Sequence, residues 1–580
     1  MEFRQSMRTT ATFLIDPSHY PSGLVVTVTS SFSENGDSLD EMDVDKQGDC
    51  FLESKKATNV RLSITSNSSN RDYYNGILFI LLFFLGVFVV AVTVSSLGFV
   101  YKGELFENVE SEARELADLS LDPDCYCSAN YFISKEDLES LGIEVEEKHA
   151  KRMKENISLA DLSKKMSDSS KSVEMYQKSA LHWPLILILS MFYCIPALQL
   201  VISEGPYRTK SNQDFCYYNF LCLKPYGKLT AFNNVFSNIG YICYGILFIS
   251  LVNMKKRKFL KAIGKLDNFD HHKFGVPQDY SIFYGLGVAL VMEGLMSGCY
   301  HICPKNIFFQ FDTTYMYLIG ILMQVKLYQN RHPDLSLGAI KTGVLLGIVL
   351  GFEAISYYEH TSPFWITFGL IYLIFILMVA LHTYTLGALK YNHHIFWNTI
   401  RLFILEVRRA LACLSVPKTA RPGQITSVKV RLLFVMILVI YNVGHVFYII
   451  IESIFYIPPD NASSHILVMI MTNLFIYTIF YITMKLMHNE FLTWSCRLYF
   501  VGSVVLIFIS IYFFTQTPKK QDDPPSISRG SNKECILFNF YDTHDLWHFL
   551  SACGLFTTFM FLLNIDEDLK YTERRLIPVF

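Results

Sequence analysis

Five residues near the ends of apolar segments have the types and spacing of a metal-dependent hydrolytic site. Ser297 and His301 are related as i and i+4, and so are His544 and His548, which places each pair on one helix face. Three neutral imidazoles with an open fourth position are a common arrangement for catalytic zinc. Asp312 adds a carboxylate that can orient or deprotonate an attacking water, and Ser297 adds a hydroxyl for a substrate oxygen. A single histidine at a span end is more often an interfacial residue, so the hypothesis depends on all five converging.

The composition indicates that membrane-spanning helices must position these residues. Hydrophobic residues make up 51% of the 580 residues and charged residues 18%, against about 25% charged in soluble domains. A stretch of about 20 mostly apolar residues is long enough to cross a bilayer as a helix. Eleven such segments predict an all-α polytopic membrane protein. The expected spans are 77–101, 183–203, 232–252, 280–299, 313–328, 338–357, 364–382, 430–451, 466–487, 496–514 and 544–564.

The order of the spans predicts that the five residues lie at one depth on one side of the membrane. The serine and histidine pair ends the fourth span, the aspartate precedes the fifth, and the two remaining histidines begin the eleventh. Consecutive spans run in opposite directions, so these three points share one membrane face. A scatter of polar residues over both faces would rarely give this arrangement.

The distribution of Lys and Arg predicts which face is cytosolic. The loops at 255–273 and 401–421 are rich in Lys and Arg, whereas 359–363 and 452–465 contain none. The N-terminus is therefore expected outside or in a lumen, and the C-terminus in the cytosol. The sequons at Asn67 and Asn461 agree with this orientation and are candidate glycosylation sites.

The remaining segments complete the expected organisation. Residues 24–29 and 60–65 alternate apolar and polar side chains like short strands. Two or three strands do not form a stable domain alone. Residues 1–76 are therefore expected to be the β-rich remnant of a larger ectodomain, shortened in the protein or in its gene model. The first span, 77–101, is followed by a charged cytosolic loop, 102–182, in which short helices are expected. Residues 183–580 are expected to form a ten-helix membrane domain that contains the zinc site.

Cysteines in the outer loops are disulfide candidates, because disulfides persist in an oxidising compartment. Cys216 and Cys222 lie in one outer loop and can pair with each other. Cys535 also lies outside and can pair with Cys303. The spacing does not decide whether these thiols are paired.

Several short motifs, in order along the chain, resemble the SID transmembrane family, the systemic-RNA-interference-defective proteins and their relatives proposed in cholesterol uptake. The resemblance covers residues 183–580 and the first span, and it includes Cys216 and Cys222. It implies an eleven-span protein for uptake of double-stranded RNA, with membrane lipids and cholesterol as partners and a homodimer as the assembly. Family members carry a long extracellular β-rich domain linked to RNA binding. The motifs are Phe232-Asn-Asn234, Ser237–Tyr241, Ser297–His301, Cys303-Pro304, Phe309–Asp312, His544–Leu550 and Asp566–Leu569.

The serine, aspartate and histidine pattern also resembles a broader superfamily that includes alkaline ceramidases and adiponectin-receptor-like proteins, which are zinc-dependent membrane amidohydrolases. By that resemblance His301, His544 and His548 are zinc ligands, Asp312 positions or deprotonates a water, and Ser297 supports the site. Whether the chain is an enzyme stays open, because such a metal can also tie two spans together structurally.

Three functions therefore stand as hypotheses: uptake of double-stranded RNA, zinc-dependent hydrolysis of a membrane lipid, and binding or uptake of cholesterol. The net charge is −2 and no large basic outer patch is visible, so composition does not itself support RNA binding. Val325, Tyr328 and Arg331 fit a loose cholesterol-recognition pattern, with an interfacial anchor as the default interpretation. The plasma membrane and the lysosomal membrane are both compatible locations.

Overall fold

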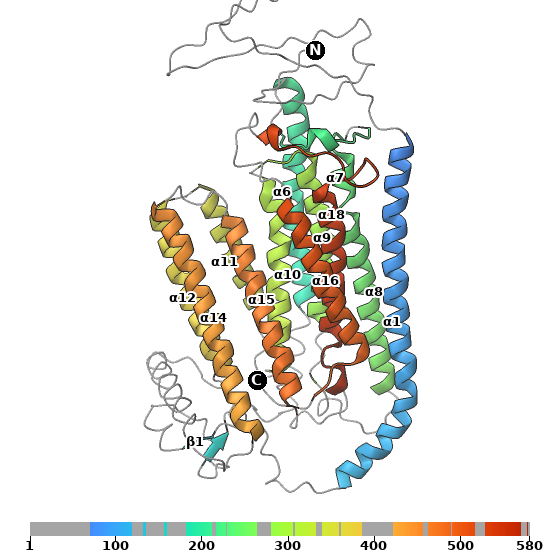
Figure 1. The fold of residues 1–580 in the computed structure, drawn as a ribbon, viewed down its shortest axis with the longest axis vertical. Helices are drawn as coiled ribbons and strands as arrows, with labels where there is room; N and C mark the ends of the chain where they lie inside the picture. The colour runs from blue at the N-terminus through green and yellow to red at the C-terminus, as the bar shows by residue number, and fades with distance from the viewer. Residues whose placement is uncertain are drawn as a thin grey trace, which may run out of the picture.

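Long helices running side by side make up most of the molecule (Figure 1). The structure is a computed structural model that describes residues 70–118, 132–134, 156–158, 181–211, 216–227, 229–263, 276, 280–305, 308–331, 339–358, 361–384, 422–455, 462–488, 490–516, 528–569, 577 and 580. Within these ranges it describes the backbone alone at 96–118, 132–134, 156–158, 200, 204–211, 260–263, 339, 353–354, 356–358, 381–384, 422–429, 432 and 462–463. The long helices in these ranges are α1 (Asn70–Asp118), α6 (His182–Ser211), α8 (Ile239–Ile263), α9 (Tyr280–Ile302), α10 (Phe309–Arg331), α11 (Ala339–Tyr358), α12 (Ser362–Tyr384), α14 (Pro422–Phe455), α15 (Ala462–Met487), α16 (Trp494–Gln516) and α18 (Thr543–Asn564). The short ones are α7 (Phe232–Phe236), η3 (Phe220–Cys222), η5 (Arg529–Ser531) and η6 (Glu567–Leu569).

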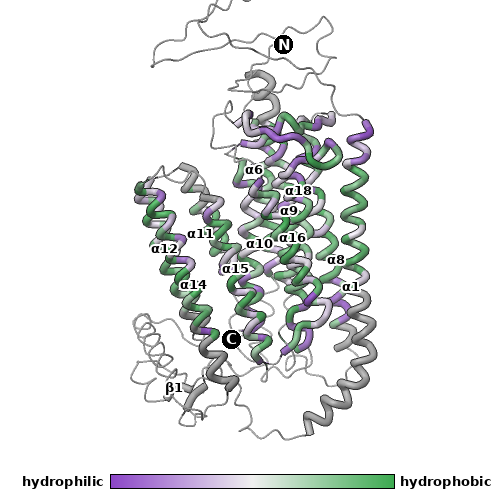
Figure 2. The backbone as a smooth tube through the Cα atoms, in the orientation of Figure 1, coloured by the Kyte–Doolittle hydropathy of each residue, from purple (hydrophilic) through white to green (hydrophobic). Residues whose placement is uncertain are grey.

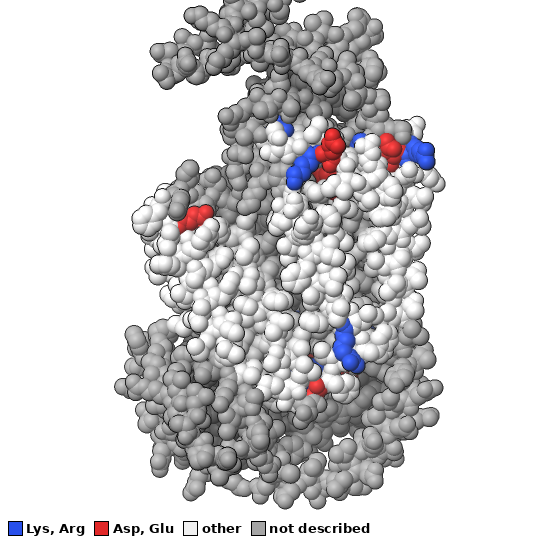
Figure 3. Space-filling view, viewed as in Figure 1, with Lys and Arg blue, Asp and Glu red and all other residues white. Residues whose placement is uncertain are grey.

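The all-α polytopic fold predicted from the sequence is confirmed. Each expected span falls on a long helix, and the third falls on α7 and α8 together. Within the described residues, nine helices are long and apolar enough to cross a membrane by length and composition. Figure 2 shows apolar residues along most of these helices, and on the face in Figure 3 the described charges lie toward the two ends.

The two long helices outside that set of nine are α10 and α11. Among the residues of α11 whose side chains the structure describes, the continuous apolar stretch is Ile340–Phe352. α10 contains polar and charged residues, yet most of its side chains are buried among other helices. A helix surrounded by protein does not need an apolar surface for lipid, which explains its modest hydropathy.

The centre of the bundle consists of α8, α9, α10 and α18. The apolar window is 78% buried in α9 and 67% buried in α18, against 17% in α16 and 22% in α1. α9 packs against α6, α8 and α10, and α18 packs against α16 and α8. α11, α12 and α14 lie to one side, and α15 joins this group to the centre through α10 (Figure 1). The candidate site residues therefore come from the most enclosed helices.

Two expected span boundaries differ from the structure. α1 continues past 101 to Asp118, into the predicted loop. The third expected span is interrupted between α7 and α8, at Ser237 and Asn238. The Ser237 hydroxyl and the Asn238 amide each donate to the backbone carbonyl of Asn234, at 2.8 and 2.9 Å. Such side-chain bonds compete with the helical backbone pattern, which explains the interruption.

The segments before and after α1 were predicted to contain short strands and short helices, respectively. Between α1 and α6, the described residues also form two short antiparallel strands, β1 (Phe132–Ser134) and β2 (Asn156–Ser158), where the sequence predicts short helices. The strands predicted at 24–29 and 60–65 lie outside the described residues, as do Asn67 and Asn461.

A buried ionic network joins α10, α15 and the segment after α18, at the end of the bundle where α10 finishes. Arg331 places Nη2 2.6 Å from Glu490 and 2.8 Å from Asp566. Lys485 places Nζ 3.0 Å from Glu490 and 2.7 Å from Asp568. Both cations have fully buried side chains, so two cations and three carboxylates neutralise most of their charge inside the protein.

The position of Arg331 overturns one interpretation of the sequence. In an interfacial anchor, a basic residue reaches the lipid headgroups. Arg331 is 1% exposed and Val325 is 8% exposed, and both face other helices. The interpretation of Val325, Tyr328 and Arg331 as an interfacial anchor is therefore wrong.

A smaller polar cluster holds α12, α14 and α15 together. The Tyr372 hydroxyl donates to Oδ1 of Asn442 at 2.6 Å, and Nδ2 of Asn442 donates to Oδ1 of Asn473 at 2.8 Å. Nδ2 of Asn473 donates to the Tyr372 oxygen at 2.8 Å, which closes a ring of hydrogen bonds. Hydrogen bonds of this kind attach neighbouring helices where lipid provides no hydrophobic driving force between them.

Candidate metal centre

Three histidines converge where the end of α9 meets the start of α18. Nε2 of His301 lies 3.0 Å from Nε2 of His548 and 3.3 Å from Nε2 of His544. One potential ligand atom from each histidine lies within 4.8 Å of the other two. His301 and His548 are buried, and His544 is half-buried. The side chains therefore present three nitrogens to one small, enclosed volume.

The donor set fits a zinc ion. Two nitrogens bound to one tetrahedral zinc at about 2.0–2.1 Å lie roughly 3.4 Å apart. The 3.0 and 3.3 Å separations between the histidine nitrogens are close to that value. Imidazole is a preferred zinc ligand, and three imidazoles leave one position for water or substrate.

The hydrogen bonds of Tyr241 determine which nitrogen of His548 carries its proton. The Ser551 hydroxyl donates to the backbone carbonyl of Trp547 at 2.6 Å. Its oxygen therefore accepts from the Tyr241 hydroxyl at 2.5 Å, because that hydroxyl has a single proton to give. The Tyr241 oxygen then accepts from Nδ1 of His548 in a long hydrogen bond of 3.4 Å. Nε2 of His548 is left with its lone pair directed at the other histidines, as metal binding requires.

Tyr241→Phe is expected to weaken zinc binding about 10- to 100-fold, because it removes the acceptor that orients His548. A competition titration with a chromophoric chelator measures this affinity. Tyr244→Phe removes the hydroxyl that accepts from Cys553 one turn along the same helix, and it should leave the affinity unchanged. Equal zinc affinity in the Tyr241→Phe variant and the unaltered chain would contradict the assigned proton position.

The carboxylates and the serine lie beside the histidines. Asp312, in the first turn of α10, interacts electrostatically with His544 and faces the Ser297 hydroxyl. Ser297 is 0% exposed, and within the part of the chain that the structure describes its hydroxyl has no hydrogen-bond partner at normal distance and angle. Glu293, one turn before Ser297 on α9, is buried near Asp312, and its Oε2 also has no such partner among the described groups. The structure thus brings the five sequence-predicted residues together.

Two aspartates at the start of α18, Asp542 and Asp545, form buried hydrogen bonds to which the sequence analysis assigned no role. The Asp542 carboxylate caps the helix by accepting from the backbone N–H groups of His544 and Asp545. The Asp545 carboxylate accepts from the side-chain amides of Asn233 at 3.1 Å and Asn234 at 3.2 Å. Asp545 is 0% exposed, so its carboxyl oxygens depend on these amides and on the backbone N–H of Asp542 for their hydrogen bonds. The spacing of the two aspartates is a signal for a helix start, whereas the pairing with α7 requires the fold.

Two disulfides join the loops at this end of the bundle. Cys216 pairs with Cys303, and Cys222 pairs with Cys535. The expected pairings of Cys216 with Cys222 and of Cys535 with Cys303 are therefore wrong. The fold brings Cys216 to the end of α9 and Cys222 to the loop before α18, with Cα separations of 5.0 and 4.9 Å. Each bridge thus fastens the 216–222 loop to a segment that leads into the histidine site.

Comparison with known proteins identifies the family. A family model described as dsRNA-gated channel SID-1 matches residues 1–580. The chain belongs to the SID-1 family. The family resemblance of the sequence motifs is thereby confirmed.

Curated proteins of known name match this SID-1-family chain over most of its length. It is 33% identical over 489 residues to SID1 transmembrane family member 1 of Mus musculus, with 82% of this chain and 55% of the relative covered. It is 33% identical over 482 residues to the protein of the same name in Homo sapiens, covering 82% and 55%. It is 33% identical over 434 residues to Cholesterol uptake protein 1 of Caenorhabditis elegans, covering 74% and 54%. The chain therefore spans about half the length of the relatives it matches.

Proposed function

We propose that this chain is the membrane part of an uptake protein for double-stranded RNA. The match of residues 1–580 to the family described as a dsRNA-gated channel carries this proposal. The bundle of long helices supplies the membrane scaffold that uptake needs. Cholesterol is the alternative cargo, because one relative is named a cholesterol uptake protein. Membrane lipids are further partners, and a homodimer is the assembly proposed from the family resemblance.

Cells that display the chain on their surface are expected to take up fluorescent double-stranded RNA faster than cells carrying an empty vector. Double-stranded DNA of the same length is the matched control, and it should not enter. Labelled cholesterol is supplied in a parallel arm. Cholesterol entry without RNA entry, at confirmed surface display, would assign the sterol as cargo. Entry of neither would overturn the uptake function.

A second proposed function is zinc-dependent hydrolysis of a lipid amide or ester. It is favoured by the buried Ser297 hydroxyl and the Asp312 carboxylate beside the three histidines. A zinc ion held by His301, His544 and His548 supplies Lewis acidity and lowers the pKa of water to about 7. Asp312 accepts a proton at its carboxylate, and the Ser297 hydroxyl donates to a substrate oxygen. The low-dielectric surroundings strengthen both interactions.

Asp312→Asn is expected to lower lipid turnover by at least about 100-fold while zinc is retained, because the amide cannot accept the proton. Turnover is followed as release of fatty acid or headgroup from labelled ceramide and phospholipid in mixed micelles. Glu534→Gln changes an exposed carboxylate at the same end and serves as the control. Unchanged turnover in the Asp312→Asn variant would remove the hydrolytic role of this residue.

We further propose that the end of the bundle with the disulfides faces the exterior or a lumen. Disulfides persist in oxidising compartments, and the opposite end carries the Lys-rich sequence after α8. The plasma membrane and the lysosomal membrane both satisfy this orientation. Glycosidase treatment should lower the apparent mass of the chain through glycans at Asn67 and Asn461. If neither asparagine carries a glycan and the two disulfides are also absent, the proposed orientation is contradicted.

A further inference from the structure

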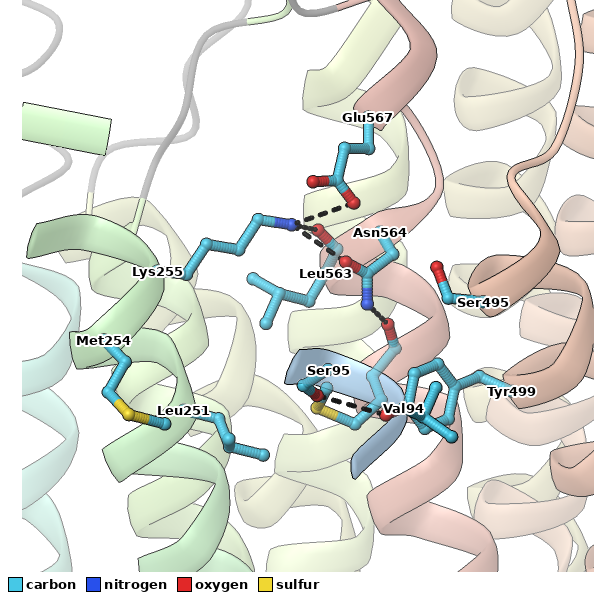
Figure 4. A pocket seen from close by; sticks show the side chains of 11 residues that line it. Val94, Ser95, Leu251, Met254, Lys255, Ser495, Tyr499, Leu563, Asn564 and Glu567 are labelled. Atoms are coloured by element: carbon cyan, nitrogen blue, oxygen red, sulfur yellow. Dashed lines mark hydrogen bonds and ion pairs between the residues drawn. The ribbon is translucent and has the colours of Figure 1, made fainter. Parts of the chain in front are cut away.

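The segment that follows α18 is fastened to its neighbours on two sides. On one side, Lys255 of α8 places Nζ 3.7 Å from the Glu567 carboxylate and donates to the backbone carbonyl of Leu563 at 2.7 Å (Figure 4). On the other side the segment joins the buried ionic network, because Asp566 pairs with Arg331 of α10. Cations of α8, α10 and, through the network, α15 therefore hold the end of α18.

The aromatic ring of Phe580 covers this network. Its centroid lies 4.5 Å from Cζ of the Arg331 guanidinium, which is the geometry of a cation–π contact. The ring stacks on the imidazole of His488, with centroids 5.6 Å apart. Phe480 and Tyr481 of α15 meet it edge to face, at 6.2 and 5.3 Å. These four side chains form a cage in which Phe580 is 0% exposed.

A second attachment lies three positions earlier in the sequence. Ile577 is 7% exposed and belongs to a small buried cluster with Leu569, the last residue of η6, and Val276, which lies between α8 and α9. The side chains of Ile577 and Phe580 thus connect the segment after α18 and the α8–α9 connection to the cage formed by α10 and α15.

The Phe580 ring can leave its cage without leaving a charge unpaired. Arg331 keeps its two bonds to the Glu490 carboxylate, at 2.9 and 2.6 Å, and its bond to Asp566 at 2.8 Å. Its Nε also donates to the Tyr481 hydroxyl at 2.9 Å. Release of the ring therefore costs the apolar burial and the cation–π contact of one side chain. A cost limited to one ring is compatible with a reversible opening.

Release of the ring would change the surroundings of the ionic network. With the ring in place Arg331 is 1% exposed, so its ion pairs are in a medium of low effective dielectric. Water that reaches the guanidinium weakens such pairs strongly. The junction of α10, α15 and the segment after α18 would then loosen. Because α15 joins α11, α12 and α14 to the centre, this junction determines how firmly that group of helices is fixed.

We propose that Phe580 is a reversible latch. Docked in its cage, it keeps the junction of α10, α15 and α18 dry and closed. Released, it allows α11, α12, α14 and α15 to move relative to the centre of the bundle. The latch is at the end of the bundle opposite the histidines, and it does not depend on the cargo proposed for the chain.

Two native cysteines report the state of the latch. Cys496, in the first turn of α16, is 0% exposed and interacts electrostatically with Asp566 and Lys485 of the network. Cys553 is also 0% exposed, but it lies about 20 Å before Asp566 along α18 and donates to the Tyr244 hydroxyl of α8. Opening of the junction should expose Cys496 alone, whereas general unfolding should expose both thiols.

The full chain in nanodiscs is treated with N-ethylmaleimide, and mass spectrometry follows modification of each cysteine. Phe580→Ala is expected to raise the rate at Cys496 about tenfold or more and to leave Cys553 unchanged, because only the closed junction loses the ring contacts. Phe580→Leu keeps much of the apolar volume and should give a smaller rise. Phe491→Ala removes a 63% exposed ring at the same end and should change neither rate. None of these substitutions alters charge, so the rates report exposure.

Three results would overturn the latch. The first is an unchanged rate at Cys496 in Phe580→Ala. The second is an equal rise at Cys496 and Cys553 in both Phe580 variants, which would assign the residue to general stability. The third is an equal rise at Cys496 in Phe491→Ala, which would show that the loss of any aromatic ring at this end has the same effect.

Discussion

The His544→Ala/His548→Ala variant is expected to purify without zinc, whereas the unaltered chain retains about one zinc ion per molecule. Two of the three nitrogens that converge within 4.8 Å are removed, and His301 alone cannot hold the ion. Metal analysis of the detergent-purified protein measures the loss directly. Chelation should also lower the melting temperature of the unaltered chain and leave that of the variant unchanged, because a ligand that binds only the folded state stabilises it.

The matched control is His445→Ala/His465→Ala. These two histidines lie on α14 and α15 with ring centroids 5.8 Å apart, and both are half-buried like His544. Their removal deletes the same number of imidazoles and should leave the zinc content unchanged. Zinc lost equally in both double variants would contradict the assigned ligands. A well-folded unaltered chain without zinc would remove the hydrolytic function.

Arg331→Met should destabilise the chain by about 3–5 kcal/mol, because it leaves buried carboxylates without their cation. In the intact network Arg331 and Lys485 form ion pairs with three carboxylates, those of Glu490, Asp566 and Asp568. After the substitution one lysine faces three carboxylates in a largely buried region, where the Arg331 and Lys485 side chains are fully buried. Methionine fills much of the same volume, so the expected loss reflects charge rather than a cavity.

Unfolding of the chain by sodium dodecyl sulfate in mixed micelles, followed by circular dichroism, measures this cost. Arg497→Met is the control, because Arg497 is an exposed arginine on α16 close to the same end. A surface substitution of this kind should change the free energy of unfolding by about 0.5 kcal/mol or less. Similar unfolding midpoints for both variants would show that the network contributes little to stability.

The positions of the spans could be predicted from the sequence because each depends on local hydropathy. α9 is an example, since residues 280–299 are apolar enough to be recognised whichever helices surround them. Other features depend on contacts between distant segments. The interruption after α7 arises from side-chain bonds to Asn234, and the burial of Arg331 depends on carboxylates more than 150 residues away in the chain. Neither signal is present in a window of neighbouring residues.

The same distinction applies to the candidate site. The i, i+4 spacing of His544 and His548 and the alternation of spans were sufficient to predict that the five residues share one membrane side. The cysteine pairing could not be predicted, because sequence proximity favours Cys216 with Cys222 while the fold separates them. The amide contacts of Asp545 likewise cross 311 and 312 positions in the chain. Local spacing identified the candidate ligands, and tertiary packing supplies the groups that hold these histidines in place.

The wide separation of the disulfide partners has a consequence for synthesis of the chain. Cys222 is made 313 residues before Cys535, and Cys216 is made 87 residues before Cys303. At about 5–20 residues per second, Cys222 waits roughly 15–60 s for its partner to be translated. During that interval the nearest available thiol is Cys216, and a bond between the two would block both native bridges. Correct pairing of the cysteines near the histidines therefore depends on thiol exchange during or after translation. We expect the yield of correctly folded chain to depend on the supply of disulfide isomerase.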